Sequence, residues 1–236
     1  MTLRLPLIAA LTAGLGLAAC SPAEPDAVVN VYSARHYASD QEVFRAFTEE
    51  TGIRVNLVEA GGDLLIERVR ADGGRSPADV IITVDAGRLH RAAEAGLFQP
   101  MTGLDDVLAR VPDTLEHPEG LWFGFATRAR VIVYARDRVD PSEVQTYGAL
   151  ASPAFEGRVC VRSSSNVYNQ SLVAGMIAED GAEAAEAFSA GIARNLARAP
   201  QGGDTDQIRA VAAGECDVAI VNHYYLARLA NAEDPA

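Results

Sequence analysis

The stretch VVNVYSARHYASDQEVFRAFTEETGIRVNLV, residues 28–58, holds a strand, a helix and a second strand in immediate succession. Residues 28–32 are apolar and β-branched, which is typical of a strand. Asp40 opens an amphipathic stretch that ends at Gly52, and these are the start and stop signals of a helix. Residues 53–58 predict the next strand. Because strands separated by a helix usually pair in parallel, this stretch predicts an α/β sheet.

The alternation continues on both sides of a longer extended segment at residues 122–135. Before this segment, we expect helices at 64–69 and 89–95 and a strand, buried on both faces, at 80–84. After it, the expected elements are helices over 142–150, 170–178, 182–193 and 206–213 and strands over 159–161 and 218–221. Two α/β units joined by one crossover predict two lobes that can close on a ligand by a hinge motion.

These patterns divide the chain into a first lobe over residues 28–127, a crossover or hinge strand over 128–136 and a second lobe over 137–236. Residues 1–19 have the layout of a secretory signal, with one early positive charge, a short apolar core and small residues at the exit. Residues 20–27, which include two prolines, predict a short tether.

The exit of the signal reads Leu-Ala-Ala-Cys20, which is similar to the lipobox of bacterial lipoproteins. In a lipobox the Cys becomes the new N-terminus and carries the lipid. The alternative is an ordinary signal peptide with an incidental Cys. We therefore expect a protein of the periplasm or cell envelope, held at a membrane only through a lipid on Cys20.

The charged residues exclude several classes of protein. All 20 basic residues are Arg and none is Lys, and with 32 acidic residues the formal net charge is −12. Walker-type phosphate loops and Schiff-base enzymes need a Lys, so both are excluded. A nucleic-acid partner is not expected either, because an acidic chain without a basic stripe repels phosphate.

Two cysteines remain after Cys20. Cys160 and Cys216 both lie in or beside apolar runs that predict strands. In an oxidising compartment such a pair predicts a disulfide, but two buried free thiols explain the same pattern equally well. The sequence does not supply the Cα separation that decides between these alternatives.

Polar and aromatic side chains gather where three predicted strands end. These segments are YSARHY at 32–37, SSSNVYNQ at 163–170 and NHYY at 222–225. Ligands of open α/β sheets bind outside the carboxyl ends of the strands, so the three segments predict a binding site.

The segments YSARHY (32–37), SPADVIITVDAGRL (76–89), RSSSNVYNQSLVA (162–174) and GECDVAIVNHYYLARL (214–229) occur in that order. With these motifs the chain resembles the ferric-iron-binding proteins of bacterial ABC importers over essentially its whole mature length. The resemblance implies the two-lobed, type II periplasmic-binding-protein α/β fold. It also implies a ferric ion held in the cleft by phenolates, here Tyr37, Tyr168, Tyr224 and Tyr225, with or without His36.

The chemistry of the ion agrees with that set. Ferric ion is a hard cation and favours anionic oxygen, by the ligand-softness rule that sends thiolates to softer metals. Tyr has an ordinary pKa of about 10, so the ion must displace its proton and binding should weaken as the pH falls.

Around the phenolates, the resemblance and the charges imply a site for a synergistic anion such as carbonate. Arg128 and Arg228 offer positive charge, and Asn222 matches a family position near the anion. Ser164, Ser165 and Asn166 lie at an expected helix N-terminus, whose N–H groups suit an anion.

One position departs from part of the family. Some members have a glutamate ligand just after the third strand, where this chain has Val84 followed by Asp85. The site therefore resembles the tyrosine-rich subgroup. The role of His36 stays open between a ligand and a neighbour of the ligands.

Some tyrosines and serines of the chain are expected to have no part in ligand chemistry. A single Tyr is more often half-buried and structural, and we assign Tyr32, Tyr134 and Tyr147 to that class. The serine run lacks a nucleophile elbow, so the sequence does not favour a hydrolase or any other enzyme.

We expect a monomeric solute-binding protein that captures Fe³⁺ and delivers it to an ABC permease. The alternatives are a relative that binds a small organic or phosphonate ligand, and an envelope enzyme or structural lipoprotein. Family members usually continue past the paired tyrosines, whereas this chain ends eleven residues after Tyr225, so we expect the C-terminal part of the second lobe to be missing.

Overall fold

The computed structural model describes residues 27–35 and 37–231. The predicted signal peptide (1–19), Cys20, the tether up to residue 26, and His36 therefore lie outside the described residues. Within the described ranges, every helix is too short or too polar to cross a lipid bilayer.

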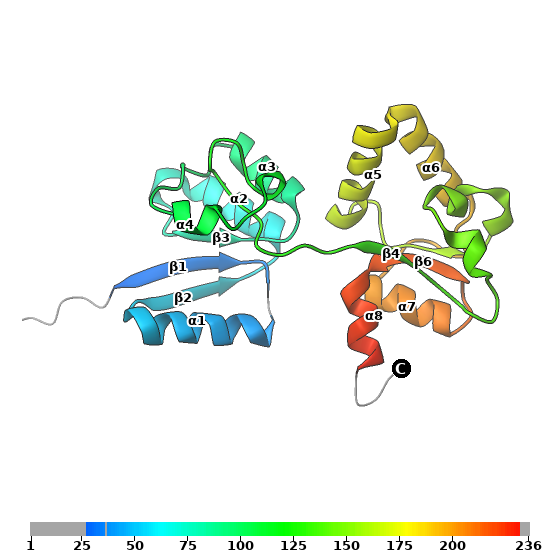
Figure 1. Cartoon of the computed structure of the whole chain (residues 1–236), viewed down its shortest axis with the longest axis horizontal. Coiled ribbons are helices and arrows are strands. Elements are labelled where there is room, and N and C mark those ends of the chain that lie inside the picture. Colours follow the sequence, from blue (N-terminus) through cyan, green and yellow to red (C-terminus); the bar gives the residue numbers. More distant parts are fainter. Residues whose placement is uncertain (1–26, 36, 232–236) are drawn as a thin grey trace, which may run out of the picture.

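Lobe 1, which carries the strand–helix–strand stretch, is built on a parallel sheet of order β2-β1-β3. Helix α1 lies on one side of this sheet and α2 and α3 on the other (Figure 1). The bounds are β1 Val28–Ser33, α1 Ala38–Thr51, β2 Arg54–Glu59, α2 Gly62–Asp72, β3 Val80–Ile82 and α3 Ala86–Glu94. The predicted parallel α/β arrangement is confirmed.

The stop signal at Gly52 acts as expected. Gly52 has φ +73°, and its N–H bonds to the carbonyl of Thr48, which ends α1 in a left-handed cap. Strand β3, in contrast, is shorter than the predicted strand and is not buried on both faces. Val80 is 42% exposed, because β3 is an edge strand that pairs only with β1 among the described strands.

Lobe 2 is built on a mixed sheet of order β4-β6-β5. Strand β4 runs antiparallel to β6, with Arg130 opposite Asn222 and Tyr134 opposite Val218, whereas β5 runs parallel to β6. Helices α5 and α6 lie on one side of the sheet and α7 and α8 on the other (Figure 1). The bounds are β4 Arg130–Tyr134, β5 Val159–Cys160, α5 Val167–Asp180, α6 Ala182–Arg194, α7 Asp204–Ala212, β6 Val218–Asn222 and α8 His223–Ala230.

The segments between the two sheets differ from the sequence prediction in two respects. Of the extended stretch 122–135, only Arg130–Tyr134 becomes a strand, since only this part pairs with β6. The helix predicted over 142–150 is replaced by the 3-10 turns Pro141–Val144 and Gly148–Ala151. The other short elements are α4 Asp105–Leu108 and the 3-10 turns Gly73–Arg75, Asp113–Leu115 and Pro153–Phe155.

The larger core lies in lobe 2, where Leu150, Phe155, Val159 and Val218 are at most 1% exposed. A second cluster of this lobe surrounds a disulfide between Cys160, at the end of β5, and Cys216, just before β6. Their Cα atoms lie 5.9 Å apart, within the range that a disulfide requires. The structure thus contains the disulfide rather than two free thiols. This bond links the end of β5 to the segment just before β6 and restricts the movement of these two segments in lobe 2.

Candidate functional site

Four tyrosines meet where the two lobes face each other, and each comes from the start of a helix. Tyr37 directly precedes α1 of lobe 1. Tyr168 lies in the first turn of α5, where the side chain of Asn166 accepts the Tyr168 N–H at 3.0 Å. Tyr224 and Tyr225 lie in the first turn of α8, with ring centroids 4.5 Å apart. The abrupt change from β6 to α8 is the turn that lets these adjacent side chains converge.

Tyr224 is the centre of the group. Its hydroxyl is close enough to the side chains of Tyr37, Tyr168 and Tyr225 to shift their pKa values and to be shifted by them. The side-chain amide of Asn222 also donates to the Tyr224 hydroxyl at 3.3 Å. Oxygen atoms from both lobes are thereby gathered around one point, and we call these residues (Tyr37, Tyr168, Tyr224 and Tyr225) the tyrosine cluster.

The tyrosines of the cluster have unequal affinities for their protons. Burial, followed by the nearness of Tyr224, raises the pKa of Tyr168 to about 12. The same two causes raise the pKa of Tyr225 and of Tyr37 above the ordinary value. Burial acts upward on the pKa of Tyr224 as well, but hydrogen bonds from Tyr225, Asn222, Tyr168 and Tyr37 outweigh it and hold this pKa below the ordinary value. The surroundings of Tyr224 therefore favour its phenolate form more than those of the other three tyrosines.

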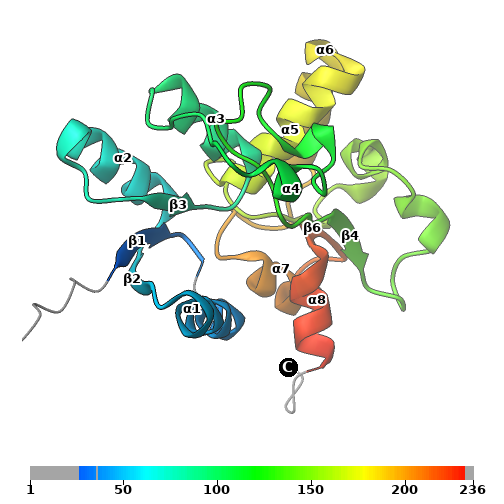
Figure 2. The same ribbon diagram turned by 60° about the vertical axis from the view of Figure 1, so that its left-hand side comes forward.

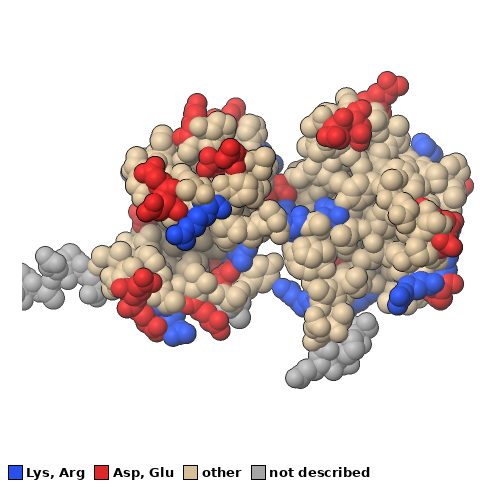
Figure 3. Space-filling view, in the orientation of Figure 1, with Lys and Arg blue, Asp and Glu red and all other residues tan. Residues whose placement is uncertain are grey.

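Arginines surround the cluster. The guanidinium of Arg128 lies 4.5 Å from the ring centroid of Tyr168, and that of Arg228 lies 5.5 Å from Tyr37 and 6.0 Å from Tyr225. Arg35 approaches Tyr37 at 5.1 Å. Blue side chains, all of them Arg in this chain, are visible in the seam between the lobes (Figure 3). Such a belt of positive charge offsets the negative charge of several phenolates held together.

The chemistry of the side chains at this place determines which ligand can bind there. Among the described residues, no three His, Cys, Asp or Glu side chains come together in a group that could hold a metal ion. The tyrosine cluster instead supplies four phenol oxygens, which become anionic donors when they lose their protons, and hard, highly charged cations prefer anionic oxygen. The arrangement therefore suits a hard trivalent cation, together with a small anion near the arginines.

The structure brings together most, but not all, of the residues expected at the site. The cluster, Asn222, Arg128 and Arg228 meet at the seam. Ser165 bonds to Ser163 at 2.8 Å within its own loop, and Ser164 lines a cavity of about 210 Å³ beside α5 and α6. Asn166 caps α5 as expected for a helix start.

Asp85, which directly follows the third predicted strand and for which the sequence predicts no role, lies between the lobes beside Arg128. It is the only non-glycine residue with positive φ in the described part of the chain, at +83°, and its side chain is only 7% exposed. Its carboxylate accepts from the Gly87 N–H at 3.1 Å and pairs with Arg128 of the crossover. It also accepts from the hydroxyl of Ser171 on α5, so one carboxylate of lobe 1 ties it to lobe 2.

We expect Asp85→Asn to favour separation of the lobes. The substitution removes the charge that holds Arg128, and hydrogen bonds to charged groups contribute about 1.5–3 kcal/mol each. Small-angle scattering of the purified protein should show a larger radius of gyration. The control is Asp63→Asn, because Asp63 also pairs with two arginines, Arg88 and Arg91, but both belong to lobe 1. Equal scattering curves for the two variants would contradict the prediction.

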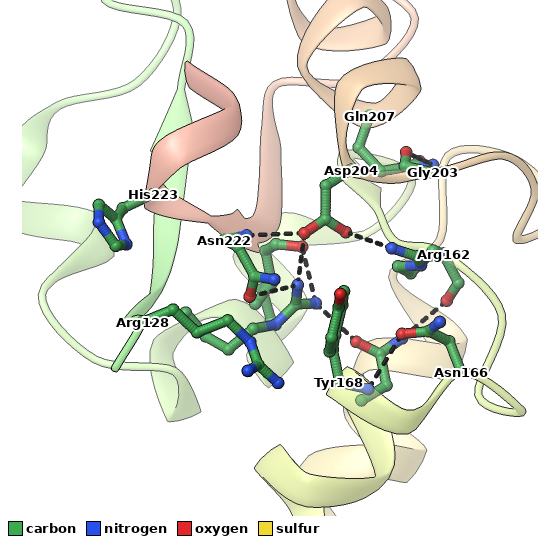
Figure 4. Close-up of polar contacts among 12 residues, drawn as sticks. Arg128, Arg162, Asn166, Tyr168, Gly203, Asp204, Gln207, Asn222 and His223 are labelled. Atoms are coloured by element: carbon green, nitrogen blue, oxygen red, sulfur yellow. Dashed lines mark hydrogen bonds and ion pairs between the residues drawn. The ribbon is translucent and has the colours of Figure 1, made fainter. Parts of the chain in front are cut away.

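The second group that the sequence did not indicate is a buried polar network close to the cluster. Arg130 joins Asp204 and Asn169 in this network, and its guanidinium lies 5.9 Å from the ring centroid of Tyr168. Figure 4 shows Asp204 and Tyr168 near each other. The motif GGDTD at 202–206 indicates only a helix start, which Gly203 and Asp206 do provide through a 2.6 Å bond. No spacing rule connects it to Arg130, which lies 74 residues earlier.

Comparison with known proteins gives a consistent result. Residues 75–235 match the family described as "Bacterial extracellular solute-binding protein". Iron uptake protein A1 of Synechocystis is 51% identical over 208 residues, which are 88% of this chain and 58% of that protein. A Trichodesmium protein (IdiA, FutA), solved in complex with iron and citrate, is 51% identical with a TM-score of 0.82 over 88% of this chain and 66% of that one. The ferric binding protein of Campylobacter jejuni is 39% identical with a TM-score of 0.83, over 88% and 66%.

The two-lobed α/β fold expected from the sequence is confirmed by these solved structures. The chain spans 58% of the length of the curated Synechocystis relative.

Proposed function

Since this chain belongs to the family of bacterial extracellular solute-binding proteins, we propose that it binds ferric ion between its lobes and delivers it to an ABC permease. The observation that carries the proposal is the gathering of three tyrosines, Tyr37 of lobe 1 and Tyr168 and Tyr225 of lobe 2, around Tyr224. The similarity to proteins named for iron uptake and ferric binding supports the same cargo. Such a protein performs no catalysis, because capture and release need only the opening and closing of the lobes.

The proposed ligands are Tyr37, Tyr168, Tyr224 and Tyr225. His36, which precedes Tyr37, completes the set either as a ligand or as a neighbour of the ligands. A small oxyanion such as carbonate is proposed to bind beside the ion, near Arg128, Arg228 and Asn222 and the start of α5 with Ser164, Ser165 and Asn166.

The proposed setting is the periplasm or cell envelope, with a lipid on Cys20 as the membrane anchor and with the protein acting as a monomer. The proposed domain boundaries are those predicted from the sequence, with residues 28–127 and 137–236 as the two lobes and 128–136 as the hinge.

Titration with ferric citrate tests the proposal. Phenolate ligands should give purified protein a visible charge-transfer band that saturates at one ion per chain. Calorimetric titrations with a phosphonate and with divalent cations test the other solutes, because a phosphonate gives no charge-transfer band. Protein that stays colourless with saturating ferric citrate would exclude ferric binding by the tyrosine cluster.

Ferric loading should weaken steeply as the pH falls. The pKa of Tyr168 is about 12, and those of Tyr225 and Tyr37 are also raised, mainly by burial, so these phenols are protonated near neutral pH. Each one that binds the ion must release its proton, so apparent affinity should fall by about tenfold per pH unit for each such tyrosine.

The measurement is the charge-transfer absorbance against a fixed citrate concentration from pH 8 to pH 5, corrected for the titration of citrate. Tyr168→Phe gives the internal comparison, because its curve should be shallower by one proton. An absorbance that does not change over this range would contradict proton-linked binding.

A further inference from the structure

Close to the tyrosine cluster lies a carboxylate that is completely buried between two arginines. Asp204, the first residue of α7, has a side chain that is 0% exposed. One of its oxygens accepts from Arg130 at 2.8 Å and from the backbone N–H of Asn222 at 2.7 Å. The other accepts from Arg162 at 3.3 Å. Figure 4 shows Asp204 between Asn222 and Arg162, with Tyr168 beside them.

Arg130 extends this contact to a second helix. Its guanidinium is held by the Asp204 carboxylate, and it donates to the side-chain oxygen of Asn169 at 2.7 Å and to the Ile220 carbonyl at 3.1 Å. Asn169 in turn donates to the carbonyl of Arg162 at 2.8 Å. Arg162 lies between β5 and the three serines at residues 163–165. The pair Arg130–Asp204 therefore contacts the start of α5 and the end of β6 at once.

These two places carry ligands proposed above. Asn169 follows Tyr168 in α5, and Asn222 is the last residue before α8, which begins with His223, Tyr224 and Tyr225. The side-chain oxygen of Asn222 accepts a hydrogen bond from Arg130 at 3.3 Å, and its side-chain nitrogen donates one to the hydroxyl of Tyr224. An unbroken path of hydrogen bonds thus runs from Asp204 to the centre of the cluster.

Packing alone does not account for a buried ion pair at this place. Removing two charges from water costs free energy that their attraction often does not recover, and apolar residues of similar volume commonly stabilise a fold as well or better. The pair does, however, fix directions and distances, because a guanidinium bonds in a rigid planar fork.

We propose that Asp204 and Arg130 are positioning residues, which fix the start of α5 relative to the start of α8 so that Tyr168 and Tyr224 meet around the ion. This inference rests on the proposed ferric function and adds residues to it that do not touch the ion.

The test compares Asp204→Asn with a matched variant, Asp217→Asn. Asp217 also joins two arginines of lobe 2, Arg138 and Arg158, each at 2.7 Å, but it lies at the opposite end of β6 from the cluster. In either variant the new amide nitrogen must face at least one N–H donor, so both lose the same kind of contact. The readouts are ferric affinity by citrate competition, the position of the charge-transfer band and the melting temperature of the iron-free protein.

We expect Asp204→Asn to weaken ferric binding by about 10–100-fold, as is usual when a partner behind a metal ligand is removed. The charge-transfer band should also shift, since the geometry of Tyr168 and Tyr224 changes. Asp217→Asn should lower the melting temperature and leave both the band and the affinity of the folded protein unchanged. Arg130→Lys, which keeps the charge but loses the fork, should behave like Asp204→Asn.

Three outcomes distinguish failure of the proposed ferric function from failure of the positioning role. If the unmodified protein binds no iron, the proposed function fails before this inference is reached. If it binds iron and folded Asp204→Asn keeps the affinity and the band, the positioning role is wrong and the function stands. If Asp204→Asn does not fold, Arg130→Lys decides, and an unchanged band there overturns the proposal.

Discussion

Replacement of Tyr224 and Tyr225 together by Phe is expected to abolish the ferric charge-transfer band and ferric binding with it. Tyr224 interacts with every other member of the tyrosine cluster, and these interactions hold its pKa below the ordinary value for tyrosine although burial opposes this. The double variant removes two proposed phenolates and the centre that gathers the remaining two. Removal of a residue that only supports a metal ligand typically weakens binding by about 10–100-fold. The loss of ferric affinity in the double variant should be larger than this.

The measurement is a ferric citrate titration followed by visible absorption and by metal analysis of the desalted protein. The matched control is Tyr134→Phe, because Tyr134 lies at the end of β4 opposite Val218, packed against the core of lobe 2. That variant should load one ion with an unchanged band. Retention of the full band in the double variant would show that the chromophore is elsewhere in the chain.

Removal of the disulfide is the second change with a large expected effect, this time on stability. Cys160 and Cys216 are 56 residues apart in sequence, so the bond closes a long loop and restricts the unfolded chain. For a loop of this length, its loss should lower the free energy of unfolding by about 2–4 kcal/mol. Lobe 2 should bear this loss, since both cysteines lie in its core beside β6.

Urea denaturation of the oxidised protein and of Cys160→Ala/Cys216→Ala measures the difference. Reductant should destabilise the unmodified protein and leave the double variant unaffected, which separates the bond from the packing of the side chains. A double variant with the same urea midpoint as the oxidised protein would contradict the prediction.

Much of the fold could be predicted because the relevant signals are local. Apolar runs, helix stop signals such as Gly52 and the alternation of strand and helix all lie within short windows of sequence. The errors come from long-range pairing. Strand β4 is limited to Arg130–Tyr134 by the length of β6, and among the described strands β3 pairs only with β1. Neither fact is written in the segment itself.

The candidate site shows the same division. The four tyrosines stand in segments that follow predicted strands, so their meeting could be expected from the topology rule for α/β sheets. Asp85, Arg130 and Asp204 could not be found in this way. Each resembles an ordinary charged surface residue in the sequence, and each acquires its role through partners distant in sequence, from 18 to 86 residues away.

The antiparallel register of β4 and β6 has a consequence for how this protein tolerates insertions and deletions. Arg130 stands directly opposite Asn222, and successive side chains of a strand point to opposite faces. Loss or gain of one residue within β4 would keep an apolar strand that still pairs, yet it would turn Arg130 away from Asp204. Single-residue changes of length in this strand are therefore a route by which a descendant could keep the fold and lose the proposed ferric site.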